Sequence, residues 1–195
     1  MQTEFSVDPL TGLIAGVRQV LSPHWDDRPA GVVPDLVIVH GISLPPGEFG
    51  GPWIDRLFAG NLPGDAHPYF AGISSLRVSA HALIRRDGEV VQYVPFIARA
   101  WHAGVSSYEG RPACNDYSIG IELEGSDAAP YTDAQYRALA ALVRAACAAL
   151  PGLKPARVVG HSDVAPGRKT DPGDAFDWPR LRALLAAGPP PGARG

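Results

Sequence analysis

Asp35-Leu36-Val37-Ile38-Val39-His40 is a continuous apolar run, rich in β-branched residues, that ends on a histidine. A run of this kind is typical of a strand that is buried on both faces of a sheet. A histidine at the end of such a strand is either a packed core residue or a ligand in a site. Taken alone, the position of His40 favours packing.

Four further strands are predicted from short apolar or alternating runs, at residues 78–84, 89–94, 117–124 and 156–159. Asp87-Gly88 is the signal for a hairpin between the first two of them. In the strand at 117–124 the even positions should be exposed or face a cleft. Glu122 is one of these positions, so it is either a solvated residue or a site residue.

One helix has a clear start and end in the sequence. It is predicted from Asp133 to Leu150. Thr132 and Gln135 form a capping box at its start, and Pro151-Gly152 ends it. Two shorter helices are expected at residues 53–58 and 178–187.

Residues 41–76 form a long insertion, rich in proline and aromatic residues, around the short helix at 53–58. A connection of this length in a compact domain usually forms a lid or wall of a functional site. We expect an ordered wall with apolar faces.

The composition indicates one globular domain with a substantial core. Apolar residues make up 46% and charged residues 19% of the 195 residues. The net charge is −3, and no basic stretch interleaves with aromatic residues, which argues against a nucleic-acid partner. We expect the domain to cover residues 1–187 and a proline-rich, disordered tail to cover residues 188–195.

The expected compartment is the cytosol. No apolar run is long enough to span a bilayer, so no membrane partner is expected. The N-terminus, Met1 to Asp8, is acidic and lacks the apolar segment of a signal peptide. Cys114 and Cys147 are too few for a disulfide framework, and their spacing does not fit a thiolate zinc site.

The segment from Gly160 to Gly173 concentrates ionisable chemistry. It contains one histidine, two aspartates and one lysine, and it is broken by two prolines and two internal glycines. This punctuation predicts a loop without helix or strand. The loop follows a short strand, so His161 should lie at a strand end. The segment is either a functional loop on a rigid strand or a solvated turn with an incidental histidine.

Two neutral imidazoles and one carboxylate form a three-ligand zinc set that leaves a fourth position for water. His40, His161 and Asp171 can supply this set. His81, His102 and Asp163 can equally compose such a set on paper, so spacing alone does not decide between them.

Several longer motifs carry a resemblance. Val39-His40-Gly41-Ile42-Ser43-Leu44-Pro45-Pro46-Gly47-Glu48-Phe49-Gly50-Gly51-Pro52-Trp53-Ile54-Asp55 closely resembles the start of the AmpD-type 1,6-anhydro-N-acetylmuramoyl-L-alanine amidases. Further similar blocks lie at residues 84–88, 99–106, 114–125 and 160–173. The resemblance runs from Ser22 to Arg182. The wider family also includes phage lysozyme-type amidases and peptidoglycan recognition proteins.

The resemblance implies a single α/β domain with a central mixed β-sheet flanked by helices. It implies one Zn²⁺ per chain, held by His40, His161 and Asp171, and catalytic roles for Glu122 and Lys169. The implied reaction is zinc-dependent hydrolysis of the amide bond between the lactyl group of (1,6-anhydro-)N-acetylmuramic acid and L-alanine of the stem peptide. The implied setting is the recycling of cell-wall muropeptides in the cytosol, by a chain that we expect to be a monomer.

Substrate contacts are expected from residues near this site, namely Phe58, Tyr69, Arg77, Trp101 and Leu123. The aromatic side chains offer flat surfaces for a sugar ring or a methyl group, and Arg77 offers a partner for a carboxylate. Core packing is the alternative role for the aromatic residues.

The remaining histidines and aspartate are expected outside the ligand set. His81 should support the sheet, and His102 should line the cleft or pack beside Trp101. His24 and His67 have no implied role. Asp163 should bond to the backbone of its own loop.

Two positions depart from the family pattern. Gly41 stands where relatives carry Asn, and Ala113 stands where they carry Arg. If those side chains contact the substrate in relatives, this chain must hold that part of it differently. Arg77 and Arg111 are possible substitutes for the missing charge.

Two other functions compete with the amidase interpretation. One is a non-catalytic binding module, as in peptidoglycan recognition proteins that keep the fold but lose a zinc ligand. Here Asp171 is present together with Glu122 and Lys169, which argues for turnover. The other is an amidase that acts outside the cell on intact wall, which the missing signal peptide opposes.

Overall fold

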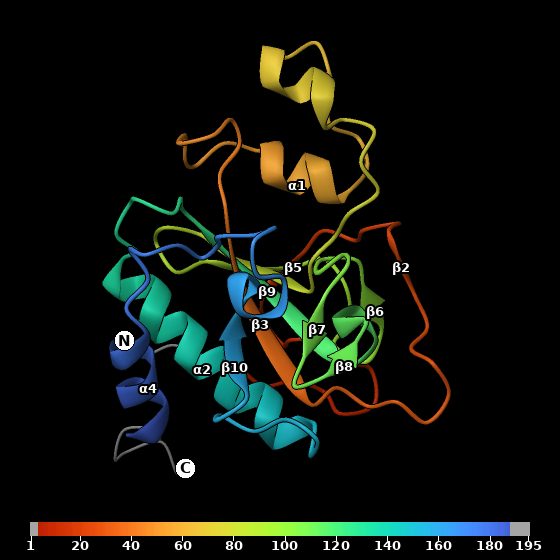
Figure 1. Cartoon of the computed structure of the whole chain (residues 1–195), viewed down its shortest axis with the longest axis vertical. Coiled ribbons are helices and arrows are strands. Elements are labelled where there is room, and N and C mark those ends of the chain that lie inside the picture. The colour runs from red at the N-terminus through yellow and green to blue at the C-terminus, as the bar shows by residue number, and fades with distance from the viewer. Residues whose placement is uncertain (1–3, 188–195) are drawn as a thin grey trace.

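A mixed β-sheet forms the centre of the structure, a computed structural model that describes residues 4–187 (Figure 1). Its six strands lie in the order β1 (Arg18–Gln19), β5 (Val90–Gln92), β4 (Ala82–Ile84), β9 (Ser118–Glu124), β3 (Leu36–Ile42) and β10 (Val158–Gly160). All neighbours are parallel except β4 and β5, which form the predicted hairpin. This sheet, with helices packed around it, confirms the predicted α/β class.

The remaining elements surround the sheet. Two small antiparallel sheets pair β2 (Trp25–Asp26) with β6 (Arg99–Ala100), and β7 (Ser107–Tyr108) with β8 (Arg111–Pro112). The helices are α1 (Trp53–Phe58), α2 (Asp133–Ala149), α3 (His161–Val164) and α4 (Trp178–Ala186), with 3₁₀ turns η1 (Pro68–Gly72) and η2 (Cys114–Asp116). No helix among the described residues is long and apolar enough to cross a membrane.

Helix α2 begins with the predicted capping box. The Thr132 hydroxyl accepts from the backbone N–H of Gln135 at 3.1 Å, and the Gln135 side chain accepts from the backbone N–H of Thr132 at 3.0 Å. The Gln135 amide also donates to the carbonyls of Ile84 and Glu124, at 3.2 and 2.9 Å. These bonds tie the start of α2 to strands β4 and β9.

The two faces of the sheet serve different purposes, because side chains alternate along a strand. The odd-numbered side chains of β3 and β9 pack in the core that contains α2 and α4: Val37, Val39, Ile119, Ile121 and Leu123. Figure 1 shows α2 and α4 together on one side of the sheet. The even-numbered side chains, which include His40 and Glu122, face the opposite side.

The insertion at residues 41–76 closes one end of that opposite side. Leu57 and Phe58 of α1 and Phe70 of η1 pack with side chains of β4 and the β5 region, so the insertion has an apolar core of its own. Figure 1 shows α1 and the η1 turn, in orange and yellow, stacked beyond the edge of the sheet. The expected ordered wall is therefore present.

Three details differ from the sequence-based expectations. Strands β4 and β5 are shorter than the predicted ranges 78–84 and 89–94. The flanking residue Ser79 bonds to Trp101 outside the sheet, and His81 accepts from both Tyr93 and Val94. All of β9 is buried, including its even positions, because both faces of this central strand are covered.

The loop at 160–173 opens with one helical turn, α3, although no helix was expected there. The prolines and glycines that interrupt helices begin only at Pro166, so the preceding residues complete one turn. The predicted tail at 188–195 lies outside the described residues, and the domain boundary at 187 stays a prediction.

Candidate metal centre and active site

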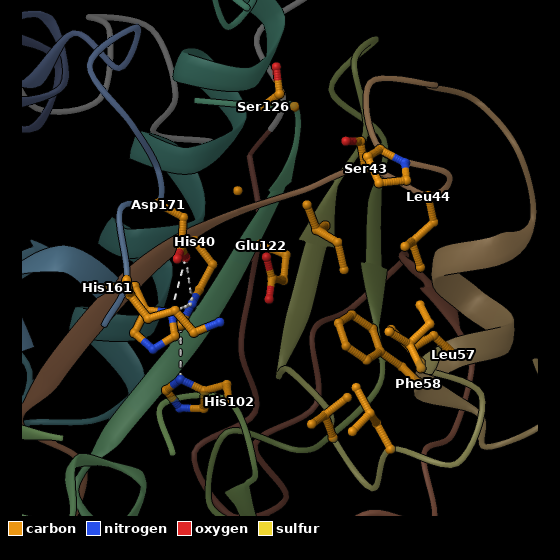
Figure 2. Close-up of a pocket in the computed structure, with 18 of the residues that line it drawn as sticks. His40, Ser43, Leu44, Leu57, Phe58, His102, Glu122, Ser126, His161 and Asp171 are labelled. Atoms are coloured by element: carbon orange, nitrogen blue, oxygen red, sulfur yellow. Dashed lines mark hydrogen bonds and ion pairs between the residues drawn. The ribbon is translucent and has the colours of Figure 1, made fainter. Parts of the chain in front are cut away.

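His40, His161 and Asp171 meet at one edge of the sheet. His40 lies near the end of β3, and His161 follows the end of the adjacent parallel strand β10. The Nδ1 atoms of the two histidines are 2.9 Å apart, and Asp171 Oδ2 lies 3.2 Å from that of His40 and 3.0 Å from that of His161. Figure 2 shows the three side chains converging on one point.

The protonation of these groups suits a cation. His161 Nε2 lies 3.2 Å from the carbonyl oxygen of Ala103, which can only accept, so Nε2 carries the proton and Nδ1 presents a lone pair to the cluster. Burial lowers the pKa of His40 to about 4, although the neighbouring Asp171 acts to raise it.

Two imidazoles and a carboxylate converge within hydrogen-bonding distance of one another. This donor set and its three-ligand count match catalytic zinc sites. Within residues 4–187, His40, His161 and Asp171 are the one group of such side chains able to hold a metal ion.

Glu122 lies beside this cluster on β9, in register with His40. Its side chain is 8% exposed, and its Oε2 atom has no hydrogen-bond partner in the described part of the chain. Burial, and then the charge of Asp171, raises the pKa of Glu122 well above its ordinary value, while Lys169 acts in the opposite direction. A buried polar atom without a partner costs free energy, so its retention points to a functional role.

A cavity of about 470 Å³ opens beside the cluster. Its lining includes the polar residues His40, His102, Glu122, His161, Lys169 and Asp171, and the apolar or aromatic residues Leu44, Phe58, Tyr69, Ile73, Leu76 and Trp101. Figure 2 shows Glu122 between the histidine cluster and the apolar Leu57 and Phe58. The volume and the mixed lining are typical of a small-molecule site.

Known proteins resemble this chain in both sequence and fold. The family model for N-acetylmuramoyl-L-alanine amidase matches residues 30–174, which contain every strand of the central sheet except β1, together with the cluster and the cavity. The chain belongs to this amidase family. It is therefore an enzyme, an amidase, and a non-catalytic binding module is no longer the competing interpretation.

Individual relatives agree with this assignment. The 1,6-anhydro-N-acetylmuramyl-L-alanine amidase AmpD of Salmonella typhimurium (strain SL1344) is 63% identical over 178 residues, which are 91% of this chain and 95% of the relative. A crystal structure of a selenomethionine derivative of AmpD superposes with a TM-score of 0.88 at 62% identity, covering 92% of this chain and 98% of that one.

A third relative was solved with a substrate. The structure of the N-acetylmuramyl-L-alanine amidase AmiD from E. coli contains anhydro-N-acetylmuramic acid-L-Ala-D-gamma-Glu-L-Lys. Its TM-score is 0.57 at 30% identity, and the match covers 80% of this chain and 60% of that chain.

The expected substrate-contacting residues of the amidase divide into three groups. Phe58, Tyr69 and Trp101 line the cavity, although Phe58 is only 2% exposed and packs edge-on against Tyr93. Arg77 is exposed, with its guanidinium 5.3 Å from the centre of the Trp101 ring.

Leu123 is not part of the cavity. It is fully buried among the side chains that pack with α2, so the expectation of a substrate contact is not supported by its position. The reason is the alternation of the strand: Glu122 faces the cavity, and its neighbour must then face the other side of the sheet.

Lys169 lies in the loop that leads to Asp171. It is exposed and lines the same cavity as Glu122 and His40. Its charge lowers the pKa of both Glu122 and His40.

The other histidines and Asp163 occupy the expected supporting positions, with one addition. His81 accepts from the backbone N–H of Gly120 at 2.9 Å and so supports the sheet. Asp163 accepts from the backbone N–H of Gly160 at 2.7 Å, within its own loop. His102 lines the cavity as expected, but it also contacts His40, with 2.9 Å between His102 Nδ1 and His40 Nε2.

No pattern in the sequence indicates this last contact, since His102 lies in an irregular segment. Nor does any pattern indicate Arg168, which donates to the carbonyls of Ala103 and Val105 at 2.6 and 2.7 Å. The Ala103 carbonyl is the one that orients His161, so Arg168 fixes the loop behind a candidate ligand.

The two departures from the family pattern have structural consequences. A Cβ atom at Gly41 would lie 2.4 Å from the hydroxyl of Tyr131, so a larger residue there requires Tyr131 to move. Of the two proposed substitutes for the charge, Arg111 pairs with Asp35 at 2.6 Å and stacks over the Tyr117 ring, whereas Arg77 lies over the Trp101 ring.

Proposed function

We propose that this chain is a zinc-dependent amidase that cleaves the bond between the lactyl group of 1,6-anhydro-N-acetylmuramic acid and L-alanine of the stem peptide. The observation that carries the proposal is the unpartnered, buried carboxyl of Glu122 beside the three converging groups of His40, His161 and Asp171. The high identity to AmpD relatives over most of the chain supports the same reaction.

Zinc is the proposed metal, one ion per chain, with His40 Nδ1, His161 Nδ1 and an Asp171 oxygen as its ligands. When bound, zinc supplies a Lewis acid and a water whose pKa is lowered to about 7. The protein's own contribution is to keep the His40 imidazole neutral by burial and to orient the His161 ring through the Ala103 carbonyl.

Glu122 is the proposed general base and acid. In the metal-free chain its pKa is raised by burial and by the negative charge of Asp171. A divalent cation held beside it would act in the same sense as Lys169 and favour the carboxylate. The carboxylate would then take a proton from the attacking water and deliver it to the departing amide nitrogen.

Lys169 is the proposed partner of the negative charge that develops on the former carbonyl oxygen. It is exposed at the cavity lining and is fixed in sequence two residues before Asp171. A charge placed there stabilises the transition state more than the neutral substrate.

The substrate is proposed to lie across the cavity, with its amide at the cluster and its sugar against the apolar wall. Phe58, Tyr69 and Trp101 would provide this wall, and Arg77 a partner for a stem-peptide carboxylate. The AmiD complex, a relative of 30% identity, contains an anhydro-N-acetylmuramic acid peptide, which supports this substrate class.

The proposed setting is muropeptide recycling in the cytosol. Cys114 and Cys147 are both free thiols in the structure, which suits a reducing compartment. One chain supplies every proposed site residue, so a monomer is sufficient for activity.

The proposal is tested by digesting defined muropeptides with the purified protein and reading the products by mass spectrometry. Anhydro- and reducing-end muropeptides of the same stem peptide form a matched pair. We expect release of the intact stem peptide from the anhydro form, loss of this release in excess chelator, and recovery on adding zinc. Cleavage within the peptide, or full activity in chelator, would contradict the proposal.

A further inference from the structure

We propose that His102 is a positioning residue that, together with Ser118, fixes which nitrogen of His40 faces the metal centre. The inference deepens the proposed function and rests on it, since it concerns the ligands of the same zinc site. It follows from a continuous line of side-chain contacts that runs from the backbone of η2 to His40.

Ser118, a fully buried residue of β9, determines which atom donates the proton in each hydrogen bond along this line of contacts. Its hydroxyl oxygen lies 2.6 Å from the Cys114 carbonyl oxygen and 3.3 Å from His102 Nε2. A hydroxyl has one proton, and the carbonyl can only accept, so the short contact uses that proton. The Ser118 oxygen is then left to accept from His102.

This leaves one arrangement for the two imidazoles. His102 donates from Nε2, so its Nδ1 atom carries a lone pair. That Nδ1 lies 2.9 Å from His40 Nε2, so His40 must donate from Nε2. The remaining nitrogen of His40, Nδ1, then presents a lone pair to His161 Nδ1 and Asp171 Oδ2.

The His161 ring reaches the same state through the Ala103 carbonyl, at 3.2 Å. Both imidazoles therefore direct lone pairs at the Asp171 carboxylate, with no proton left to bridge them. Three such groups repel one another unless a cation lies between them. Outer hydrogen bonds of this kind hold ligand imidazoles in proteins, and removing one typically costs 10–100-fold in metal affinity.

The strand behind His102 is shaped to admit its ring. A Cβ atom at Gly120 would lie 2.4 Å from Cγ of His102, so the ring occupies the space that any other residue at 120 would fill. Gly120 lies between Ser118 and Glu122 on the face of β9 that carries the site. The sheet thus provides both the hydrogen-bond partner of His102 and the room for its ring.

If His102 acts only by packing, its substitutions should affect zinc affinity differently than if it positions His40. Two substitutions distinguish these roles. His102→Phe keeps the ring but removes both nitrogens. His102→Asn loses the ring but places its Oδ1 near the position of Nδ1, where it can accept from His40. Packing favours Phe over Asn, whereas positioning favours Asn over Phe.

The experiment measures the zinc dissociation constant of the full chain by competition with a chromophoric chelator. We expect His102→Phe to weaken zinc binding about 10–100-fold and His102→Asn to recover most of the loss. Ser118→Ala should weaken binding less than His102→Phe, because His102 keeps its contact with His40. His24→Phe is the matched control, a histidine that stacks on Trp101 outside this line of contacts, and should bind zinc like the unsubstituted chain.

Nitrogen NMR of the histidine rings gives a second readout, and its main measurement uses the unsubstituted chain. In the unsubstituted chain with zinc, His40 and His102 should both carry their proton on Nε2. In metal-free Ser118→Ala, the proton of His102 is expected to move to Nδ1 in part of the population.

The inference is overturned if His102 carries its proton on Nδ1 in the zinc-bound chain, or if His102→Phe binds zinc as tightly as the unsubstituted protein. Either result leaves the proposed function standing, because the unsubstituted chain still binds zinc. If the unsubstituted chain binds no zinc at all, the proposed function itself fails, and the role of His102 fails with it.

Discussion

His40 and Glu122 lie opposite each other in the register of the parallel strands β3 and β9. Both are even-numbered positions that face away from α2. A candidate metal ligand and a candidate base are therefore held side by side by the hydrogen bonds of the two longest central strands, rather than by flexible loops. The geometry between them is set by the fold, and the following predictions depend on it.

The first prediction concerns the metal. The purified protein should contain one zinc per chain, and His161→Ala should lose most of it, because it removes one of three ligands. Elemental analysis measures the content. His67→Ala, which removes an N-terminal cap of η1 far from the cluster in sequence, serves as the control and should retain zinc. Full zinc in His161→Ala would show that the ligand set is wrong.

The second prediction concerns Glu122. Glu122→Gln keeps the shape of the side chain but cannot take a proton, so zinc should remain while amide cleavage falls by about 10²–10⁴-fold. Zinc content and cleavage are measured on the same sample. Cleavage near the unsubstituted rate with zinc bound would exclude Glu122 as the base, and loss of zinc would show that it holds the metal instead.

The third prediction concerns Lys169. Lys169→Met removes the charge and keeps the stem, and it should lower kcat by about 10²–10³-fold with a smaller change in KM. The charge on the substrate oxygen exists only in the transition state, which is why kcat carries the effect. Lys154→Met, at the other lysine of the chain, is exposed and far from the cavity lining, and should leave kcat unchanged.

The fourth prediction concerns the stability of the metal-free chain. Burial, and then the charge of Asp171, raises the pKa of Glu122 above its ordinary 4.5. Below that pH the carboxyl is protonated in both the folded and the unfolded chain. As the pH rises above it, the unfolded chain releases the proton and the folded chain retains it, so the free energy of unfolding decreases until the folded-state pKa is passed.

Glu122→Gln removes this penalty, because an amide does not ionise. The variant should therefore unfold at a higher temperature than the unsubstituted metal-free protein at about pH 8, and the difference should vanish near pH 4. The free energy of unfolding should differ by about 1.4 kcal/mol for each unit by which the folded-state pKa exceeds the unfolded-state pKa. Thermal unfolding in chelator at several pH values measures this. A gap that is constant with pH would show that Glu122 is not ionisable in the way proposed.

The fifth prediction concerns the cysteines. Cys114 is buried and Cys147 half-buried, and both are free. Cys147 lies on α2, partly buried at the edge of the core. Thiol titration of the unfolded, unreduced protein should count both, and in the folded protein Cys147 should react first. A count of zero would contradict the cytosolic setting.

Several parts of the structure can be predicted from short stretches of sequence. The apolar run at 35–40 identified the central strand, and Thr132 with Gln135 identified the start of α2. Asp87-Gly88 identified the hairpin turn, where Gly88 has a φ of 91° that other residues rarely adopt. These features depend on neighbours a few residues away, so local pattern is sufficient to find them.

The candidate site can be predicted from local sequence patterns only in part. Long motifs around His40, Glu122 and His161 pointed to the family, and the structure brings the proposed ligands together. The expectation that Leu123 contacts the substrate is not supported, although Leu123 adjoins Glu122 in the sequence. The pleat of β9 separates the two neighbours onto opposite faces.

By itself, then, the sequence determined the central strands, the capped helix, the family and the residue types available for a metal. Only the tertiary structure decided that His102 contacts His40 across 62 positions of the chain, that Ser118 orients His102, and that Arg111 is already paired with Asp35. Such contacts depend on strand order, register and the face to which each side chain points. Those properties are set when distant segments pack together, and no local pattern of residues contains them.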